Sequence, residues 1–490
     1  MENRLRAAEM KGTSSINKSI VKVLSVFTSL QVVNVICGMV KMKFVSIWLE
    51  ASGVGLFGIF QQVTDTTATL TDFGLRQSAT REVAMKRNDG RLLGRLLGTI
   101  RSWNLLVGIF GGVLLTFLSP LLSSLFFESS AFWWSFVLLG VCILFNAMTA
   151  GENSILQGLS RFKELARAGL IASLTGLAVS IPLFRFLGNN SVIFSLLAYA
   201  VAAWISIRRF RPRDIEAESP SPALLKEGKD FAKLGGYMAL AAFISSLALT
   251  IFIWWLNHYA STSEVGYYQA GNTLVVRYMG FVLSAIGLEF YPRIAACGDS
   301  SMRRSVYVSH EMSLTLTILT PLVLLFLVAR PWLVELLYTP EFDVIIPFIT
   351  FGILHTIFRV PSVIMAYTIV SQGNGLVYLI VESLDSMFGL AVCIAGYTLY
   401  GLSGLGVSFI IWYAGYLALT WIVAGIKYDV RVKRGGVAAL IVSVAVTFAS
   451  AALVCTAPAY IYIPVLLLAV VPYALRLKTL LGKGRRRKKR

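Results

Sequence analysis

The chain has 490 residues, of which 56% are apolar and only 14% are charged, too few charges to cover the surface of a soluble protein of this length. The formal net charge is +19, but the basic residues gather in short segments between long apolar runs. This distribution is typical of membrane topology and argues against a nucleic-acid partner.

Apolar runs of about 20 residues recur along the chain, and each is long enough to cross a bilayer as a helix. The sequence therefore predicts an all-α integral membrane protein with about 14 transmembrane helices. The spans lie near residues 20–48, 53–74, 96–119, 131–150, 166–187, 191–207, 234–256, 265–290, 308–329, 344–369, 376–397, 403–425, 436–456 and 459–476.

The connecting loops alternate in charge. Basic loops follow spans two, four, six, eight and twelve, whereas the other loops are short and nearly uncharged or acidic. The positive-inside rule places both termini in the cytoplasm, which agrees with an even number of spans. A basic tail should then bind the anionic inner leaflet. It consists of Arg485, Arg486, Arg487, Lys488, Lys489 and Arg490.

The first twelve spans contain an internal repeat. Val54–Phe57 (VGLF) matches Val265–Tyr268 (VGYY) at a shift of 211 residues, and GLAVSI from Gly176 matches GLAVCI from Gly389 at a shift of 213. Each copy has six spans, so both have the same membrane orientation, with a pseudo-two-fold axis along the membrane normal and a central cavity between two lobes.

This repeat predicts four parts of the chain. They are an N-terminal lobe (1–207), a cytoplasmic linker (208–233), a second lobe (234–425), and a C-terminal part (426–490) with two unpaired spans and the basic tail. The Pro, Ser and mixed charges of the linker are typical of a mobile connector.

Polar residues within the spans follow helical spacings and predict stripes that line the cavity. Lys41 continues one such stripe on span one, whereas Lys43 points away and can reach the outer interface. The other polar residues that we place on stripes are Gln31, Asn34, Gln61, Asp65, Thr69, Asp72, Thr273 and His355. For His355, hydrogen-bonded packing between helices is the favoured interpretation.

Three cations lie deep within spans, on faces otherwise lined by polar or small residues: Lys41, Arg277 and Arg359. We expect them to bind an anionic head group, because guanidinium forks suit phosphate oxygens. Four carboxylates, Asp65, Asp72, Glu382 and Asp385, either pair with other charges between helices or couple transport to an ion.

Several kinds of site are missing from the sequence. It has no GxxxxGK[ST] nucleotide loop, no metal-ligand cluster and no outward loop long enough for a catalytic domain. We therefore expect no metal, no cofactor and no enzymatic activity.

Two segments resemble the polysaccharide and O-antigen flippases of the MOP superfamily, which also contains lipid II flippases and MATE exporters. They are LEASGVGLFGIFQQVTDTTATLTDFGLRQSATREVA (Leu49–Ala84) and SEVGYYQAGNTLVVRYMGFVLSAIGLEFYPRIA (Ser263–Ala295). The resemblance implies a two-lobed fold that alternates between inward and outward openings. It also implies a polyprenyl-pyrophosphate-linked oligosaccharide as substrate, moved to the periplasmic leaflet of the bacterial inner membrane, and contact with the polysaccharide polymerase machinery.

Four other functions stay open. Two of them, a lipid II flippase and an enterobacterial common antigen flippase, are closely related to the O-antigen flippase that we favour. A MATE-type exporter of cationic compounds would favour carboxylates over deep cations. A membrane polysaccharide polymerase or ligase is opposed by the short outward loops.

Overall fold

The computed structural model consists of helices. It describes residues 2–72, 74–87, 89–212, 215, 218–219, 221–225, 236–277, 280, 290, 293–294, 297–298 and 300–487, and these residues contain no β-strand. The side chains of residues 2–32, 77, 222–223 and 477–487, and therefore that of Gln31 and those of the basic tail, lie outside this description. The prediction of an all-α fold is confirmed.

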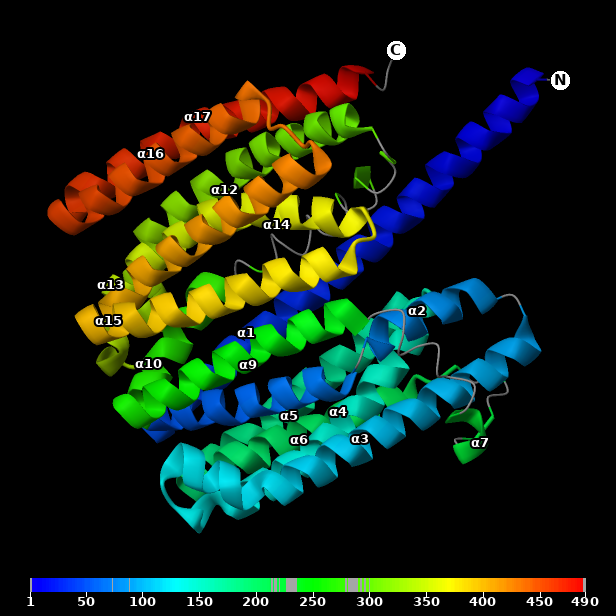
Figure 1. The fold of residues 1–490 in the computed structure, drawn as a ribbon, viewed down its shortest axis with the longest axis vertical. Coiled ribbons are helices and arrows are strands. Elements are labelled where there is room, and N and C mark those ends of the chain that lie inside the picture. The colour runs from blue at the N-terminus through cyan, green and yellow to red at the C-terminus, as the bar shows by residue number, and fades with distance from the viewer. Residues whose placement is uncertain are drawn as a thin grey trace. The chain divides into compact units, whose positions relative to one another are not determined.

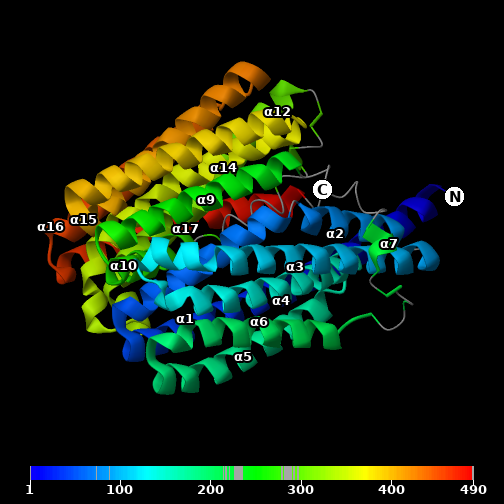
Figure 2. The same cartoon turned by 60° about the horizontal axis from the view of Figure 1, so that its bottom comes forward.

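Figures 1 and 2 show the helices in chain order. The first part contains α1 (Glu2–Asp72), α2 (Leu75–Lys86), α3 (Gly90–Phe127), α4 (Trp133–Gly158), α5 (Phe162–Leu187), α6 (Ser191–Arg209) and the short α7 (Pro222–Leu225). Next come α9 (Gly236–Tyr259), α10 (Thr262–Asn272) with a π-helical turn η3 (Thr273–Arg277), and α12 (Ser301–Leu337). The last part contains α13 (Ile346–Gly352), α14 (Thr356–Ser371), α15 (Gly375–Tyr428), α16 (Arg434–Thr456) and α17 (Ala459–Arg487).

Ten helical stretches in the described residues are long and apolar enough to cross a membrane. Three of them each cover two predicted spans: Val33–Asp72, Phe162–Arg209 and Gly375–Tyr428. The second half of the predicted span 265–290 lies largely outside the described residues. The chain is thus a multi-pass membrane protein, and fourteen crossings stays a prediction.

Each of these three stretches contains a sharp change of backbone direction. The turning residues are Glu50 (φ 58°, ψ −163°), Gly188 (φ 55°, ψ −141°) and Gly401 (φ 59°, ψ −145°). Glycine suits this positive φ because it has no Cβ. Gly188 and Gly401 are separated by the repeat shift of 213 residues, so the same turn occurs at the same place in both copies.

Helix caps follow the repeat as well. Asp89 caps α3 by accepting a hydrogen bond from the backbone N–H of Leu92, and Ser300 caps α12 by accepting one from that of Arg303. Both pairs of positions differ by 211 residues. Each cap satisfies a donor that the first turn of a helix leaves free.

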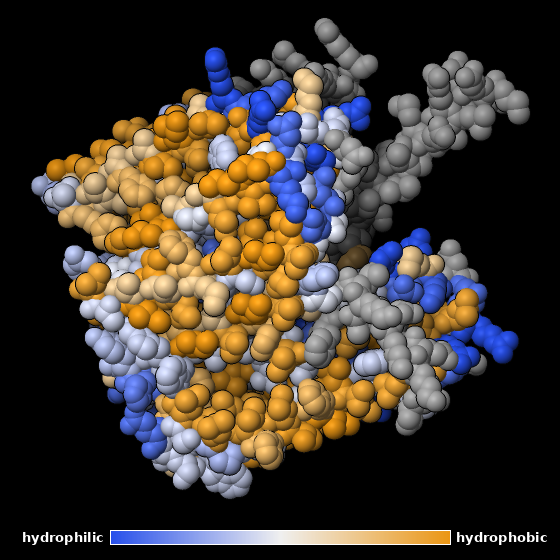
Figure 3. All heavy atoms as spheres, in the orientation of Figure 1, coloured by the Kyte–Doolittle hydropathy of each residue, from blue (hydrophilic) through white to orange (hydrophobic). Residues whose placement is uncertain are grey.

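The chain divides into two compact units, Met1–Phe243 and Ile244–Arg490, and the division falls inside α9. Within each unit the sides of the helices are mainly apolar, and hydrophilic residues gather towards helix ends on the face drawn in Figure 3. This pattern is that of helices in contact with lipid along their length.

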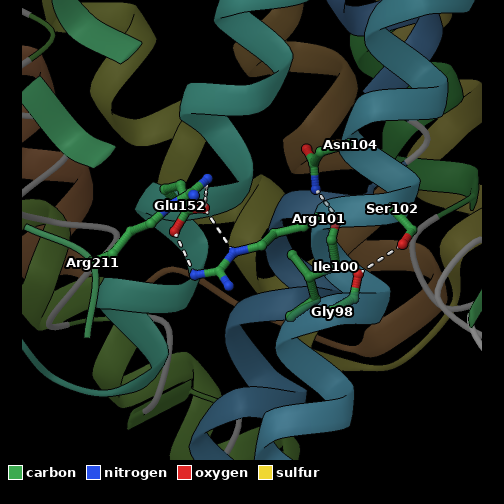
Figure 4. Close-up of polar contacts among 7 residues, drawn as sticks. All are labelled: Gly98, Ile100, Arg101, Ser102, Asn104, Glu152 and Arg211. Atoms are coloured by element: carbon green, nitrogen blue, oxygen red, sulfur yellow. Dashed lines mark hydrogen bonds and ion pairs between the residues drawn. The ribbon is translucent and has the colours of Figure 1, made fainter. Parts of the chain in front are cut away.

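A buried charge cluster stabilises the first unit near the end of α6 (Figure 4). Glu152 on α4, whose side chain is only 2% exposed, accepts a 2.8 Å hydrogen bond from Nε of Arg101 on α3. Arg211, just after α6, places Nη2 2.6 Å from the same oxygen, Oε1. Burial lowers the pKa of the Arg211 guanidinium, and the Glu152 carboxylate opposes that shift.

The described part of the predicted linker packs against this unit. The backbone N–H of Ser221 donates to Oγ of Ser102 at 3.0 Å, and that of Glu218 donates to the carbonyl of Gly94 at 3.2 Å. Ile215 packs on a buried cluster formed by α2, α3 and α4, and Leu224 is 3% exposed. The described residues of the linker up to Leu225 therefore belong to the first unit, although the composition of the linker is typical of a mobile connector.

Glycines allow close approach of an aromatic ring at one repeated position. A Cβ on Gly389 would lie 2.2 Å from Cε2 of Trp412, and a Cβ on Gly176 would lie 2.8 Å from Cδ2 of Tyr199. Both contacts join the same two helical segments of the repeat, because each pair of equivalent residues differs by 213 positions. A bulkier residue at either glycine would push the ring away.

Replacing Glu152 with Gln should destabilise the protein strongly, because it leaves two arginines without their counter-charge. We expect a loss of about 3 kcal/mol, the lower end of the range for a broken buried ion pair, since both arginines keep some solvent contact. The matched control is Glu82→Gln, which removes an exposed pair with Lys86 and should cost less than about 1 kcal/mol. Thermal unfolding in detergent measures both, and equal losses would contradict the role of the cluster.

Replacing Gly389 with Ala should lower the melting temperature more than Gly176→Ala. The indole of Trp412 is held by a hydrogen bond to Asp385, whereas Tyr199 is 44% exposed and can move. Overpacking of a tight site costs about 1–3 kcal/mol. Gly38→Ala, whose Cβ meets nothing within 4 Å, is the neutral control. A larger effect at Gly176 than at Gly389 would show that the tight contact is misassigned.

Candidate functional site

A cavity of about 380 Å³ lies within the second unit. It is bounded by α9, α10, α14 and both halves of α15, and charged and aromatic side chains share its wall. The charged residues are Arg359, Glu382 and Asp385, and the main aromatic ones are Phe252, Tyr268, Trp412, Tyr413 and Tyr416. The structure thus brings together three of the residues that the sequence singled out.

The two carboxylates lie one helical turn apart on the first half of α15, and each is held by an aromatic residue of the second half. The Tyr416 hydroxyl donates to Oε1 of Glu382 at 2.5 Å, and Nε1 of Trp412 donates to Oδ1 of Asp385 at 2.8 Å. Asp385 is 8% exposed. Each carboxylate keeps an oxygen that this aromatic hydrogen bond does not use, so the pair can bind a proton or a cation.

Arg359 reaches the same cavity from α14. Its Cζ lies 5.2 Å from the centre of the Tyr413 ring, a cation–π contact. Within the described residues it forms no ion pair with Glu382 or Asp385, and its buried Nη1 has no hydrogen-bond partner. A guanidinium group whose buried N–H has no partner is suited to bind an anion that enters the cavity.

The first unit repeats this frame with different side chains. Ser245 and Ser386 share a hydrogen bond of 2.7 Å, and at the equivalent positions Ser173 donates to Oδ1 of Asn34 at 2.6 Å. Phe252 packs on Tyr268 with ring centres 5.0 Å apart. At the equivalent pair, Nζ of Lys41 lies 4.5 Å from the centre of the Phe57 ring. Lys41 therefore occupies the place that Phe252 has in the second unit.

The remaining predicted residues of α1 do not share one environment. Nε2 of Gln61 donates to Oδ1 of Asp65 at 2.9 Å on an exposed face, and the Thr69 hydroxyl donates to the carbonyl of Thr66. Asp72 is half-buried at the end of α1. Asp65 and Asp72 are thus apart from each other, unlike Glu382 and Asp385.

Span eight presents a different face to the cavity from the one that we chose. The lining residues are Tyr268, Asn272 and Val276, and the last two come one position before the predicted Thr273 and Arg277. Arg277 is exposed and ends the π-helical turn η3. The shift of 211 makes Asn272 and Val276 the equivalents of Gln61 and Asp65.

His355 lies in the core rather than on the cavity wall. It is 0% exposed, its Nδ1 lies 2.5 Å from the carbonyl oxygen of Gly352, and its ring packs 4.8 Å from that of Tyr413. Its 3-10 turn, Ile353–His355, interrupts the helix one turn before Arg359. The described residues hold no group of three or more His, Cys, Asp or Glu side chains that could bind a metal ion.

The comparisons with known proteins agree with this architecture. The profile of the polysaccharide biosynthesis protein family matches residues 45–347. A Shigella flexneri protein named as a candidate O-antigen transporter is 23% identical over 278 residues, which are 56% of this chain and 63% of that relative. The matched region thus spans less than two thirds of the relative's length.

Solved structures resemble most of the chain. A lipid II flippase in an inward closed conformation has a TM-score of 0.66 at 14% identity and covers 94% of this chain and 99% of its own. An inward-facing multidrug resistance MATE family transporter has a TM-score of 0.63 at 15% identity, covering 81% and 94%. A MOP superfamily transporter from Pyrococcus furiosus has a TM-score of 0.57 at 18% identity, covering 84% and 95%.

These relatives are named as transporters and flippases, not as enzymes. The identities to the solved structures are low, so those matches show the fold. The resemblance inferred from the two sequence segments is confirmed. Because the family profile covers more than half of the chain, this protein belongs to the polysaccharide biosynthesis protein family and has the fold of the MOP superfamily transporters.

Proposed function

We propose that the protein is a flippase for a polyprenyl (undecaprenyl) pyrophosphate-linked oligosaccharide, an O-antigen repeat unit. The observation that carries this proposal is the Arg359 guanidinium in the cavity of the second unit, with Nη1 free of partners in the described residues. A planar fork of N–H donors matches pyrophosphate oxygens. Membership of the polysaccharide biosynthesis family supports an oligosaccharide as the rest of the substrate.

We assign Lys41 and Arg277 to the same substrate path as Arg359. Both are cations in apolar helices, where a charge needs a partner or a ligand. The cation–π contact of Lys41 with Phe57 stabilises the ammonium group and leaves its N–H donors available. The three residues would contact the pyrophosphate at successive stages, as alternating access carries it across the membrane.

We base the direction of transport and the membrane location on the charge of the loops. The basic loops favour an inner-membrane protein with both termini in the cytoplasm, and the basic tail at residues 485–490 would bind anionic lipid. The substrate would then load at the cytoplasmic leaflet and leave at the periplasmic leaflet. Contact with the polysaccharide polymerase machinery would follow on that side.

Glu382 and Asp385 are the residues that we propose for coupling to an ion. They share one cavity with Arg359, whereas Asp65 and Asp72 lie apart from each other. Protonation or cation binding at the pair would change the charge that Arg359 and its anion experience. Loss of that proton or cation restores the negative charge of the pair, which would repel the pyrophosphate from Arg359, so an ion gradient could drive release of the substrate.

The acidic pair also favours a second candidate function, a cation-coupled exporter of the MATE type. Carboxylates beside Trp412, Tyr413 and Tyr416 form a site that could hold an organic cation. Arg359 in the same cavity opposes this candidate, because it would repel such a compound. The two candidates differ in what loss of Arg359 should do.

Replacing Arg359 with Ala should abolish surface polysaccharide in a flippase-null strain that depends on this protein, because the pyrophosphate loses a charged fork. Arg277→Ala should reduce it, and Arg359→Lys should restore part of it. Protein level in the membrane is measured alongside.

The matched control is Arg431→Ala, since that arginine is 87% exposed and pairs with Asp429. Normal surface polysaccharide in both Arg359→Ala and Arg277→Ala would contradict a cationic substrate path. Gain of resistance to cationic compounds in Arg359→Ala would favour the exporter instead.

Replacing Glu382 with Gln, or Asp385 with Asn, should make flipping in proteoliposomes insensitive to an imposed proton or sodium gradient. The neutral side chains keep the hydrogen bonds to Tyr416 and Trp412 but cannot gain or lose charge. Asp65→Asn is the control and should retain the gradient dependence. If both cavity variants respond to the gradient like the wild type, coupling does not run through this pair.

A further inference from the structure

A second cavity, of about 260 Å³, lies within the first unit and has no role in the proposal above. It is formed by α1, α4, α5 and α6 and is lined by Asn34, Asn153, Gln157 and Tyr199 among others. None of its described lining residues is charged. Its volume is below the range of about 300–1,000 Å³ for drug-sized ligands, so it can hold one small polar group.

Its polar wall is a stripe on α4, in which Thr149, Asn153 and Gln157 are spaced by four residues. The Thr149 hydroxyl is used by a 2.8 Å hydrogen bond to the carbonyl of Phe145. Within the described part of the chain, the side-chain amides of Asn153 and Gln157 have no hydrogen-bond partner. Each amide offers both donors and acceptors, and both residues are half-buried, so their amides are open to a ligand in the cavity.

The repeat shows how the wall of this cavity differs from that of the second-unit cavity. The positions equivalent to Glu382, Asp385 and Tyr416 are Gly169, Ala172 and Ala203, all of which line the first-unit cavity. The charged and bulky side chains of the second-unit cavity are thus replaced by small, uncharged residues in the first unit. The first-unit cavity has room for a ligand group and no charge to select an ion.

Gln157 shows the same divergence. With a small gap in the repeat, LQGLSRF from Leu156 resembles SQGNGLV from Ser371, which makes Gln372 its counterpart. Oε1 of Gln372 accepts a 2.7 Å hydrogen bond from the buried Arg304. That glutamine therefore has a structural role in the second unit. Gln157 lacks such a partner and faces a cavity instead.

The cavity also lies at the helix ends where a substrate from the cytoplasm would enter. Gln157 is one residue before the end of α4, Leu165 is in the first turn of α5, and Ile207 is in the last turn of α6. These ends are joined to the basic loops that we assign to the cytoplasmic side. A substrate that loads from the cytoplasm would therefore reach this cavity before it is transported.

We propose that this cavity binds one uncharged sugar ring, through amide hydrogen bonds from Asn153 and Gln157 to its hydroxyl groups. The inference rests on the proposed flippase function and names the part of the substrate that the first unit recognises. Amides pair with neighbouring hydroxyls as both donor and acceptor. The first unit then recognises the sugar, and the cationic residues bind the pyrophosphate.

The test compares two lipids as ligands of the purified full-length protein in nanodiscs. One is the lipid-linked oligosaccharide extracted from a strain that lacks the flippase, and the other is the bare polyprenyl pyrophosphate. Gln157→Leu and Asn153→Leu should each weaken binding of the first lipid by about tenfold, as expected for loss of one or two hydrogen bonds. Binding of the bare lipid should stay within twofold of the wild type.

A third variant controls for misfolding of the first two. Gly169→Leu fills the cavity, and a Cβ at Gly169 meets no atom within 4 Å, so the helix can carry the side chain. It should produce the same selective loss. Thr175→Ala is the control, since its exposed hydroxyl donates only to its own helix, and it should bind both lipids normally.

The outcomes separate this inference from the function on which it rests. Equal weakening of both lipids, or wild-type binding in all three variants, would overturn the sugar site alone. So would a wild-type protein that binds the glycosylated lipid no more tightly than the bare one. A wild-type protein that binds neither lipid would overturn the flippase function, and the sugar site with it.

Discussion

A charge inside a bundle of apolar helices must be paired, stacked or matched by a ligand, and this constraint explains most of the polar architecture of the protein. Glu152 satisfies it with two arginines and thereby fixes the segment after α6 to the first unit. Lys41 satisfies it with an aromatic ring. Arg359 satisfies it only in part, and this incomplete pairing distinguishes a binding residue from a structural one.

The two units use one backbone frame for different chemistry. Equivalent caps, equivalent glycine turns and the equivalent contacts Ser245–Ser386 and Asn34–Ser173 hold the frame in both copies. The cavity side chains have diverged, with an acidic pair and an arginine in one unit and uncharged amides in the other. A substrate with a charged pyrophosphate and neutral sugars needs both kinds of surface, so the divergence fits the proposed function.

Much of the fold could be predicted from sequence because membrane spans and repeats are long-range patterns. The apolar runs predicted the helices, and the repeated VGLF and GLAVSI segments predicted the repeat shift. Gly188 and Gly401, which this shift relates, have closely similar backbone angles. Helical spacing also placed Glu382 and Asp385 on one face, and the structure adds Arg359 to the same cavity. These features depend on periodicity and repetition along the chain, which a single sequence displays.

Other features depend on contacts that spacing does not reveal. Span eight turns a different face to the cavity from the one predicted, because helical spacing alone does not tell which of two adjacent stripes lines it. The Glu152 cluster joins residues 51 and 59 positions apart, and no motif marks it. The linker looks mobile by composition, yet the buried Leu224 and two backbone hydrogen bonds attach it to α3.

The most direct test of the account is the rate at which lipid-linked oligosaccharide crosses the bilayer of liposomes that contain only the purified protein. The account predicts that the protein accelerates this movement well above the rate in protein-free liposomes, and that an ordinary phospholipid is not accelerated. Movement no faster than in protein-free liposomes, with correctly folded protein present, would contradict it.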